Sequence, residues 1–249
     1  MNTEKSFEIS KKEVWKSYKL LKESGLIKKE LLKLCELNLK NNLYFLWNRL
    51  SSGSYFPPKV DINNLKEKKT EKDNLLEVLD YIAQMLIKKN LDFNFDEYKI
   101  NNSQNFKQFD WILKIDYTGL HNYIEHDLII KALRFHTNSR WIILNIKRWI
   151  QLPAIMTDGS LQKNDYGISE KKIIGPVLSN LFYHYCLDRW IQNNFPYILF
   201  ERSLEQAIFL CKNIDETKKL EQALRKRMVE CRLPVETIVH FIHVKNINN

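Results

Sequence analysis

A short segment in the middle of the chain constrains the fold more than any other. Residues 111–116 read WILKID, an apolar run that alternates once in polarity and ends on the carboxylate of Asp116. Gly119 follows, and residues 124–136 then show the apolar spacing of a helix. A strand that ends in aspartate and leads into a helix often holds that carboxylate at the rim of a sheet, where it can bind a cation. The segment therefore predicts a sheet with Asp116 at its rim.

The rest of the chain predicts many helices and a few further strands. Apolar spacing predicts helices over 10–24, 26–50, 75–91, 124–136, 138–152, 173–194 and 214–231. Short apolar runs predict strands over 198–200, 207–211 and 238–244, with a hairpin turn at 157–160 and loops over 61–74 and 94–108. Helices combined with a few antiparallel strands indicate the α+β class.

Composition narrows the range of partners. The chain has 249 residues, with 39 lysines and arginines against 30 acidic residues and a formal charge of +9. A positive surplus favours polyanionic partners, nucleic acid above all, although lysine-rich solvated faces explain it equally well. The four cysteines are widely spaced and are expected to be buried free thiols (Cys35, Cys186, Cys211 and Cys231). No apolar run is long enough to span a membrane, so a cytoplasmic or organellar location is expected.

Several segments resemble the reverse transcriptase encoded by group II introns. The most specific is LYFLWNRLSSGSYFPPKV at 43–60, followed in family order by LDYIAQMLIKKNL at 79–91 and WILKIDYTGLHNYIEHDLIIKALRFHT at 111–137. GPVLSNLFYHYCLDRW at 175–190 and FERSLEQAIFLC at 200–211 also fit. The resemblance implies the fingers and palm of a right-hand polymerase, with helices packed on a small antiparallel palm sheet. It assigns 1–110 to N-terminal helices and degraded fingers and 111–249 to the palm, and it leaves out the thumb, maturase and endonuclease domains.

The resemblance also implies a catalytic site, and the sequence departs from it. In the family, the aspartate equivalent to Asp116 and two adjacent aspartates of a Tyr-Ala-Asp-Asp hairpin bind two Mg²⁺ ions. Here that hairpin reads Ser203-Leu204-Glu205-Gln206. Glu205 keeps a carboxylate on a longer side chain, whereas Gln206 carries no charge. Asp116 and Glu205 are thus the remaining candidate catalytic residues and metal ligands, and we expect weak Mg²⁺ binding or none.

Other departures point the same way. The Pro-Gln-Gly-Gly segment of the family aligns with residues 169–172, where charged side chains replace glycine, and its fingers motif is missing at 70–75. The sequence therefore predicts a catalytically inactive remnant that retains binding to intron-type RNA or an RNA/DNA hybrid. The candidate contacts to nucleic acid are Lys171, Lys172, Arg202, Lys218, Arg225, Lys226 and Arg227.

Two alternative functions remain open at this stage. One is an active RNA-directed DNA polymerase, and another is an interaction module or decaying reading frame without enzymatic activity. At the level of single residues, Asp116 can simply cap the segment that follows it, and the cations can form an ordinary solvated face.

Overall fold

The fold combines helices with small sheets, as the α+β class requires. The computed structural model describes residues 7–58, 60–61, 70–91, 109–156, 160–169, 173–203, 205–234 and 239–243. They form two compact units: unit 1 is Met1–Asp92, Leu133–Asp165 and Ser169–Gly175, and unit 2 is Phe93–Ala132, Tyr166–Ile168 and Pro176–Asn249. The predicted subdomains were 1–110 and 111–249. The units differ from them, because 133–165 and 169–175 belong to unit 1 together with the N-terminal helices. The predicted loop over 94–108 lies outside the described residues.

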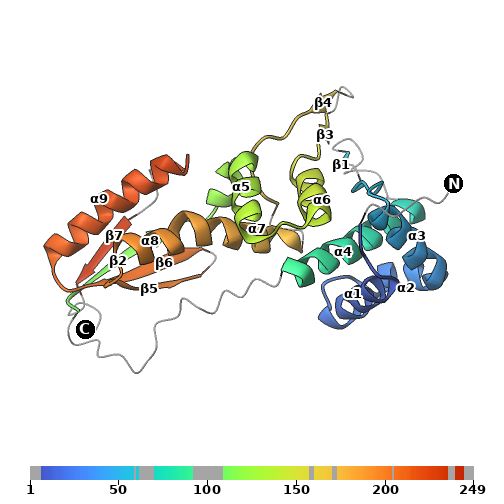
Figure 1. The fold of residues 1–249 in the computed structure, drawn as a ribbon, viewed down its shortest axis with the longest axis horizontal. Helices are drawn as coiled ribbons and strands as arrows, with labels where there is room; N and C mark the ends of the chain where they lie inside the picture. The colour runs from blue at the N-terminus through green and yellow to red at the C-terminus, as the bar shows by residue number, and fades with distance from the viewer. Residues whose placement is uncertain are drawn as a thin grey trace. The chain divides into compact units, whose positions relative to one another are not determined.

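Unit 1 is built around one long helix. Its helices are α1 (Lys11–Ser24), α2 (Lys29–Glu36), α3 (Leu39–Ser51), α4 (Glu71–Leu91) and α6 (Arg140–Ile150). The first three pack against α4 (Figure 1), in which every residue from Val78 to Ile87 except the half-buried Tyr81 is buried. Because α4 is covered around most of its circumference, it forms the core of this unit.

Local signals set the ends of these helices. Ser10 and Glu13 form a capping box at the start of α1, and Gly25 ends it in the left-handed conformation, with φ of 67°.

Between α1 and α2, Glu36 accepts hydrogen bonds from the Tyr18 hydroxyl at 2.5 Å and the Lys22 ammonium at 2.8 Å. The Lys22 and Tyr18 hydrogen bonds lower the pKa of Glu36 below its ordinary value.

Two predictions in unit 1 were wrong in detail. The single helix expected over 26–50 is divided into α2 and α3, because Asn38 leaves the helical conformation with φ of −140° and Leu37 is 83% exposed. Both halves contact α4. Helix α4 also begins at Glu71, inside the predicted loop over 61–74, because Thr70 and Asp73 cap it reciprocally. Residues 62–69 lie outside the described part.

A small three-stranded sheet completes unit 1. Strand β1 (Val60–Asp61) pairs in parallel with β3 (Ala154–Ile155), which pairs antiparallel with β4 (Leu161–Gln162). Strands β3 and β4 flank the predicted hairpin turn at 157–160, of which only Ser160 is described. Helix α5 (His126–His136) begins in unit 2 and ends in unit 1, and α7 (Ile174–Tyr183) begins in unit 1 and continues into unit 2.

Unit 2 contains the sheet that the central segment predicted. Its strands are β2 (Trp111–Asp116), β5 (Leu199–Arg202), β6 (Gln206–Cys211) and β7 (Val239–His243), in the order β5-β6-β2-β7 and all antiparallel to their neighbours. All four strands were predicted from the sequence. The predicted helix over 214–231 is α9 (Ile214–Glu230), which packs on β2 and β6 (Figure 1).

The long helix predicted over 173–194 is continuous but changes its winding. After α7, residues His184–Asp188 form the π-helix η5, and α8 (Arg189–Asn194) follows. A short 3-10 helix, η4 (Leu120–Tyr123), lies between β2 and α5. In the part of the chain that the structure describes, no helix is both long and apolar enough to cross a membrane.

Candidate functional site

Sheet register places Asp116 directly opposite the turn that the sequence paired with it. In the β2–β6 ladder, Asp116 is the partner of Gln206 and Ile115 is the partner of Ala207. Partners in an antiparallel ladder project to the same face, so the Asp116 carboxylate and the Gln206 amide are neighbours on one face of the sheet. Ile115 and Ala207 are buried on the other face. The two positions, 90 residues apart in the sequence, therefore form one site.

The Asp116 carboxylate also caps the turn that follows β2. Its Oδ1 accepts a hydrogen bond from the backbone N–H of Thr118 at 2.9 Å, and the side chain is half-buried. The capping role that the sequence left open is therefore present in the structure. Next to it, the N–H of Tyr117 donates to the carbonyl of Glu205 at 2.8 Å, so backbone atoms hold the two segments together while the Glu205 side chain is exposed.

Ser203 stabilises the turn between β5 and β6. Its N–H donates to the Gln206 carbonyl at 2.8 Å, and its hydroxyl oxygen accepts from the N–H groups of Gln206 at 3.2 Å and Glu205 at 3.3 Å. Small polar side chains commonly satisfy turn backbone in this way. Ser203, which stands where the family has tyrosine, thus has a structural role here.

A buried ion pair lies under the same turn and corrects one prediction. Arg202 binds Asp188 of η5 through two hydrogen bonds, Nε to Oδ1 and Nη2 to Oδ2, each 2.7 Å long. Its Nη1 donates to Asn180 Oδ1 at 2.9 Å, and only 2% of its side chain is exposed. The guanidinium of Arg202 is thus enclosed and bound to Asp188 and Asn180, which argues against the predicted contact with nucleic acid.

Electrostatics around this pair follow from its burial. Burial lowers the pKa of Arg202, but the Asp188 carboxylate more than offsets this and raises it on balance. Burial raises the pKa of Asp188 against the opposing effect of Arg202. Sequence reasoning missed Asp188, although it is the single acid of the largely apolar helix predicted over 173–194, which was a signal for a buried, paired charge.

Tyr117 connects β2 to the helix beneath the sheet. Its ring centroid lies 4.7 Å from that of Tyr183 at the end of α7, and its hydroxyl donates to the Ser203 carbonyl at 3.1 Å. Burial raises the pKa of the Tyr117 hydroxyl well above its ordinary value, so it stays protonated as a donor. Tyr117 and Arg202 together fix the position of the turn from below.

The predicted cations of α9 fall into two groups. Lys218 and Lys226 are exposed, and Arg225 is half-buried beside Glu221 in an ion pair of 2.8 Å. Arg227 instead turns inward, where its Nε donates to the Cys186 carbonyl at 2.7 Å and its guanidinium lies 5.9 Å from the Trp190 ring. Arg227 thus joins α9 to η5. Its Nη1 also pairs with Glu230 at 3.1 Å and 24% of its side chain is exposed, so its contact with nucleic acid stays a prediction.

The remaining residue predictions concern two lysines and the four cysteines. Lys171 and Lys172 lie outside the described residues. All four cysteines are buried free thiols, as expected. Cys186 and Cys231 share a side-chain hydrogen bond, which the sequence spacing did not reveal.

The donor atoms of the site do not suit a pair of magnesium ions. Two divalent cations about 3.5–4 Å apart need several carboxylates to offset their mutual repulsion. Here Asp116 faces the neutral amide of Gln206, and one Asp116 oxygen already accepts a backbone hydrogen bond. Among the described residues, no cluster of three or more histidine, cysteine, aspartate or glutamate side chains is arranged to hold a metal ion.

Comparison with known proteins adds little beyond general architecture. No protein-family model and no curated protein sequence matches the chain. A structure of apo telomerase from Candida tropicalis, truncated from the C-terminal domain, aligns at 10% identity and a TM-score of 0.49, covering 76% of this chain and 46% of that one. Another structure of apo telomerase from Candida tropicalis aligns at 8% identity and a TM-score of 0.43, covering 84% and 41%. The chain thus spans less than half of either structure, and values this low establish no family.

Proposed function

We propose that the chain is a palm of the reverse-transcriptase type that has lost catalysis and retains RNA binding. The observation that carries the proposal is the register of β2 and β6, in which Asp116 faces Gln206. An acid at the end of a central strand, beside a hairpin turn in an antiparallel sheet, is the arrangement that the sequence resemblance to group II intron reverse transcriptases implies. The amide at the facing position removes the charge on which metal-dependent nucleotidyl transfer depends.

The loss of catalysis follows from charge rather than from a distorted sheet. The ladder from Trp111 to Asp116 pairs without interruption with Cys211 to Gln206. A glutamine oxygen can ligate a metal ion but contributes no negative charge, and Glu205 is an exposed turn residue whose carbonyl is hydrogen-bonded to Tyr117. The strand pair that would support the chemistry is therefore uninterrupted, while its metal-binding groups are incomplete.

Retained RNA binding is supported by the charge of the chain. The formal charge is +9, and Lys218 and Lys226 lie exposed on α9 with their ammonium groups available to phosphate. Neutralising phosphates releases condensed counterions, which makes such binding favourable and dependent on salt. Arg202 does not contribute to this proposal, because internal partners occupy its guanidinium group.

Primer extension tests the catalytic part of the proposal. The wild-type chain and an Asp116→Ala variant are incubated with poly(rA)/oligo(dT) and labelled dTTP in Mg²⁺ or Mn²⁺. We expect equal, background incorporation by both proteins. Incorporation by the wild type that the Asp116→Ala substitution abolishes would overturn the proposal and restore the active polymerase as the function.

A salt series tests the RNA-binding part. Affinity for an RNA oligonucleotide is measured by filter binding between about 50 and 200 mM salt, where log K should fall linearly with log salt. Replacing Lys218 and Lys226 with glutamine should weaken binding and flatten the slope by about 0.7 for each phosphate that the protein no longer neutralises. The matched control replaces both with arginine, which preserves charge and should preserve the slope. A wild-type affinity that does not change with salt would contradict the proposal.

A further inference from the structure

Cations lie against aromatic rings at two places on unit 1. Lys11 lies over the rings of Tyr44 and Trp47, at 4.9 and 4.5 Å from their centroids. Farther along α3, the Arg49 guanidinium lies 5.3 Å from the Phe45 ring. Tyr44 is 52% exposed and Phe45 44% exposed. Such interleaving of positive charge and exposed ring faces is the chemistry that binds unpaired nucleic acid, because bases stack on the rings while phosphates meet the cations.

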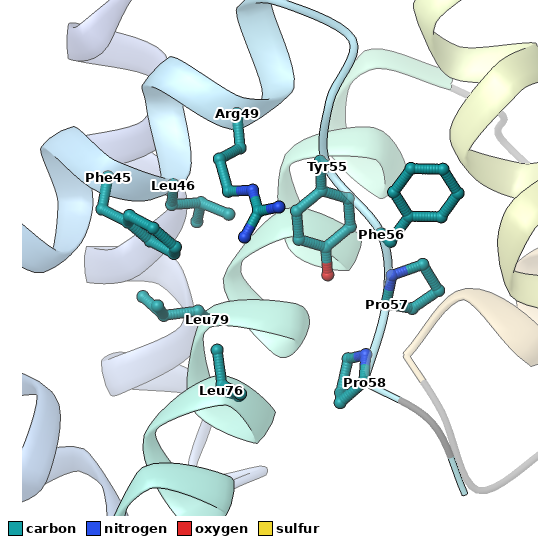
Figure 2. A pocket seen from close by; sticks show the side chains of 9 residues that line it. All are labelled: Phe45, Leu46, Arg49, Tyr55, Phe56, Pro57, Pro58, Leu76 and Leu79. Atoms are coloured by element: carbon teal, nitrogen blue, oxygen red, sulfur yellow. The ribbon is translucent and has the colours of Figure 1, made fainter.

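A pocket of about 230 Å³ that includes the second of these pairs, Phe45 and Arg49, opens between α3, α4 and the segment after α3 (Figure 2). Its lining residues are Phe45, Leu46, Arg49, Tyr55, Phe56, Pro57, Pro58, Leu76 and Leu79. Figure 2 shows the Arg49 side chain between Phe45 and Tyr55, with Phe56 on the far side of Tyr55. The pocket is smaller than the roughly 300–1,000 Å³ of sites for drug-sized ligands, and its size suits a single planar ring system.

The wall that carries Phe56 is held by a buried network. The Tyr55 hydroxyl and the Trp149 indole N–H both donate to Oδ1 of Asp80, the latter at 2.7 Å. Arg148 donates to the carbonyls of Gly53 and Tyr55, and its guanidinium lies 4.0 Å from the Phe56 ring. Burial of Tyr55, together with the Asp80 carboxylate, raises the pKa of its hydroxyl, so this donor stays protonated.

Rigid support beneath the segment leaves Phe56 exposed. Tyr55 is only 6% exposed, whereas the adjacent Phe56 ring is 65% exposed. The exposed ring of Phe56 leaves apolar surface in contact with water, which is unfavourable. Pro57 and Pro58 restrict the backbone that follows it. The segment therefore presents a ring face whose position is already fixed, so little conformational entropy is lost when a flat ligand stacks on it.

We propose that this pocket binds the base of an unpaired RNA nucleotide, with Phe45 and Phe56 as stacking faces and Arg49 as the partner of its phosphate. The inference rests on the RNA binding proposed above and names its preferred form, a single strand. In a duplex the base faces are stacked on one another and cannot enter a pocket of this size. A proline-rich peptide would fill the apolar walls but would leave Arg49, the one charged residue among the nine that line the pocket, without an anion.

Fluorescence anisotropy tests the proposal on the full chain. The probes are a fluorescein-labelled oligouridine of about 12 nucleotides and an RNA hairpin of similar charge, with a fully paired stem closed by a non-nucleotide linker so that it has no unpaired base. Phe56→Leu keeps an apolar side chain and removes the ring. It should weaken oligouridine binding by about tenfold or more, since stacking on an aromatic ring contributes strongly to the affinity for each base, and should leave hairpin binding unchanged.

Two further variants separate stacking from charge and from folding. Arg49→Gln should lower the salt slope for oligouridine by about 0.7, the value for one phosphate contact to a single strand. Tyr197→Leu removes an exposed ring (55% exposed) from unit 2 and should bind both probes as the wild type does. Because Phe56 is exposed, its replacement should leave the thermal melting curve unchanged, and that curve is recorded for each variant.

The possible results distinguish the two proposals. If the wild type binds neither probe, the RNA-binding function itself is wrong. If it binds RNA but Phe56→Leu binds oligouridine with wild-type affinity, the pocket proposal is overturned and the proposed function stands. Binding of a labelled proline-rich peptide that Phe56→Leu abolishes, with oligouridine binding unaffected, would also overturn it and identify the pocket as a peptide site.

Discussion

Removing one partner of the buried Arg202–Asp188 pair should destabilise unit 2 strongly. We consider the substitution Asp188→Leu, which leaves the guanidinium without its carboxylate. Asp188 is fully buried and only 2% of the Arg202 side chain is exposed, so water cannot replace the two hydrogen bonds of 2.7 Å that the substitution removes. Breaking a buried ion pair in this way costs about 3–5 kcal/mol, because an uncompensated charge remains in a medium of low polarity.

The matched double variant separates the cost of an unpaired charge from the loss of attraction. Asp188→Leu with Arg202→Met replaces the pair by apolar side chains of similar volume, which in buried pairs is often neutral or even stabilising. The double variant should therefore be more stable than Asp188→Leu alone. A change in unfolding free energy for the double variant that differs from the sum of the two single changes would indicate a direct interaction between the two side chains.

Equilibrium urea unfolding provides the measurement. With a dependence of about 1–3 kcal/mol per molar urea, a loss of 3 kcal/mol moves the midpoint down by about 1 M or more. A midpoint for Asp188→Leu that matches the wild type would refute the reasoning. The double variant should also keep the salt dependence of RNA binding, since Arg202 is enclosed; a flatter slope would show that Arg202 reaches phosphate after all.

Three other predictions follow from single sites. Gln206→Asp adds a carboxylate opposite Asp116 and should raise Mn²⁺ affinity at least tenfold by isothermal titration calorimetry; an unchanged affinity would show that charge is not what limits metal binding. Glu36→Gln should cost about 0.5–1 kcal/mol at pH 7, and because the pKa of Glu36 is lowered in the folded state, the difference in urea stability should disappear as the pH falls through that pKa. Gly167→Ala should lower the free energy of unfolding by about 1–3 kcal/mol, since φ is 87° and an added Cβ would lie 3.0 Å from a backbone oxygen. The control Gly25→Ala, with φ of 67° and no atom within 4 Å of the added Cβ, should lower the melting temperature less.

Much of the secondary structure was readable because it follows from local pattern. The strand over 111–116 follows from the apolar pattern of its own six residues, and the end of the first helix follows from Gly25. The division of 26–50 into two helices could not be read in this way. Both halves contact α4, which begins 20 residues after the end of α3, and contacts of this kind lie outside a local pattern.

The sequence also predicted a shortage of negative charge near Asp116, because the charge of a side chain follows from its residue type. Gln206 is neutral wherever it lies, and the resemblance to a known hairpin predicted that it would lie near Asp116. The register of the ladder confirms that proximity. What Asp116, Glu205 and Gln206 bind stays a prediction, which the primer-extension and calorimetric experiments address.

By itself the sequence determined the class of fold, the order of its strands along the chain and the shortage of negative charge beside Asp116. Only the tertiary structure decided which cations are available to a ligand. Arg202 and Lys218 carry the same charge in the sequence, but the first is enclosed with Asp188 and the second is exposed. The physical reason is that desolvation depends on neighbours brought together from distant segments, so the availability of a charge cannot be read from its residue type.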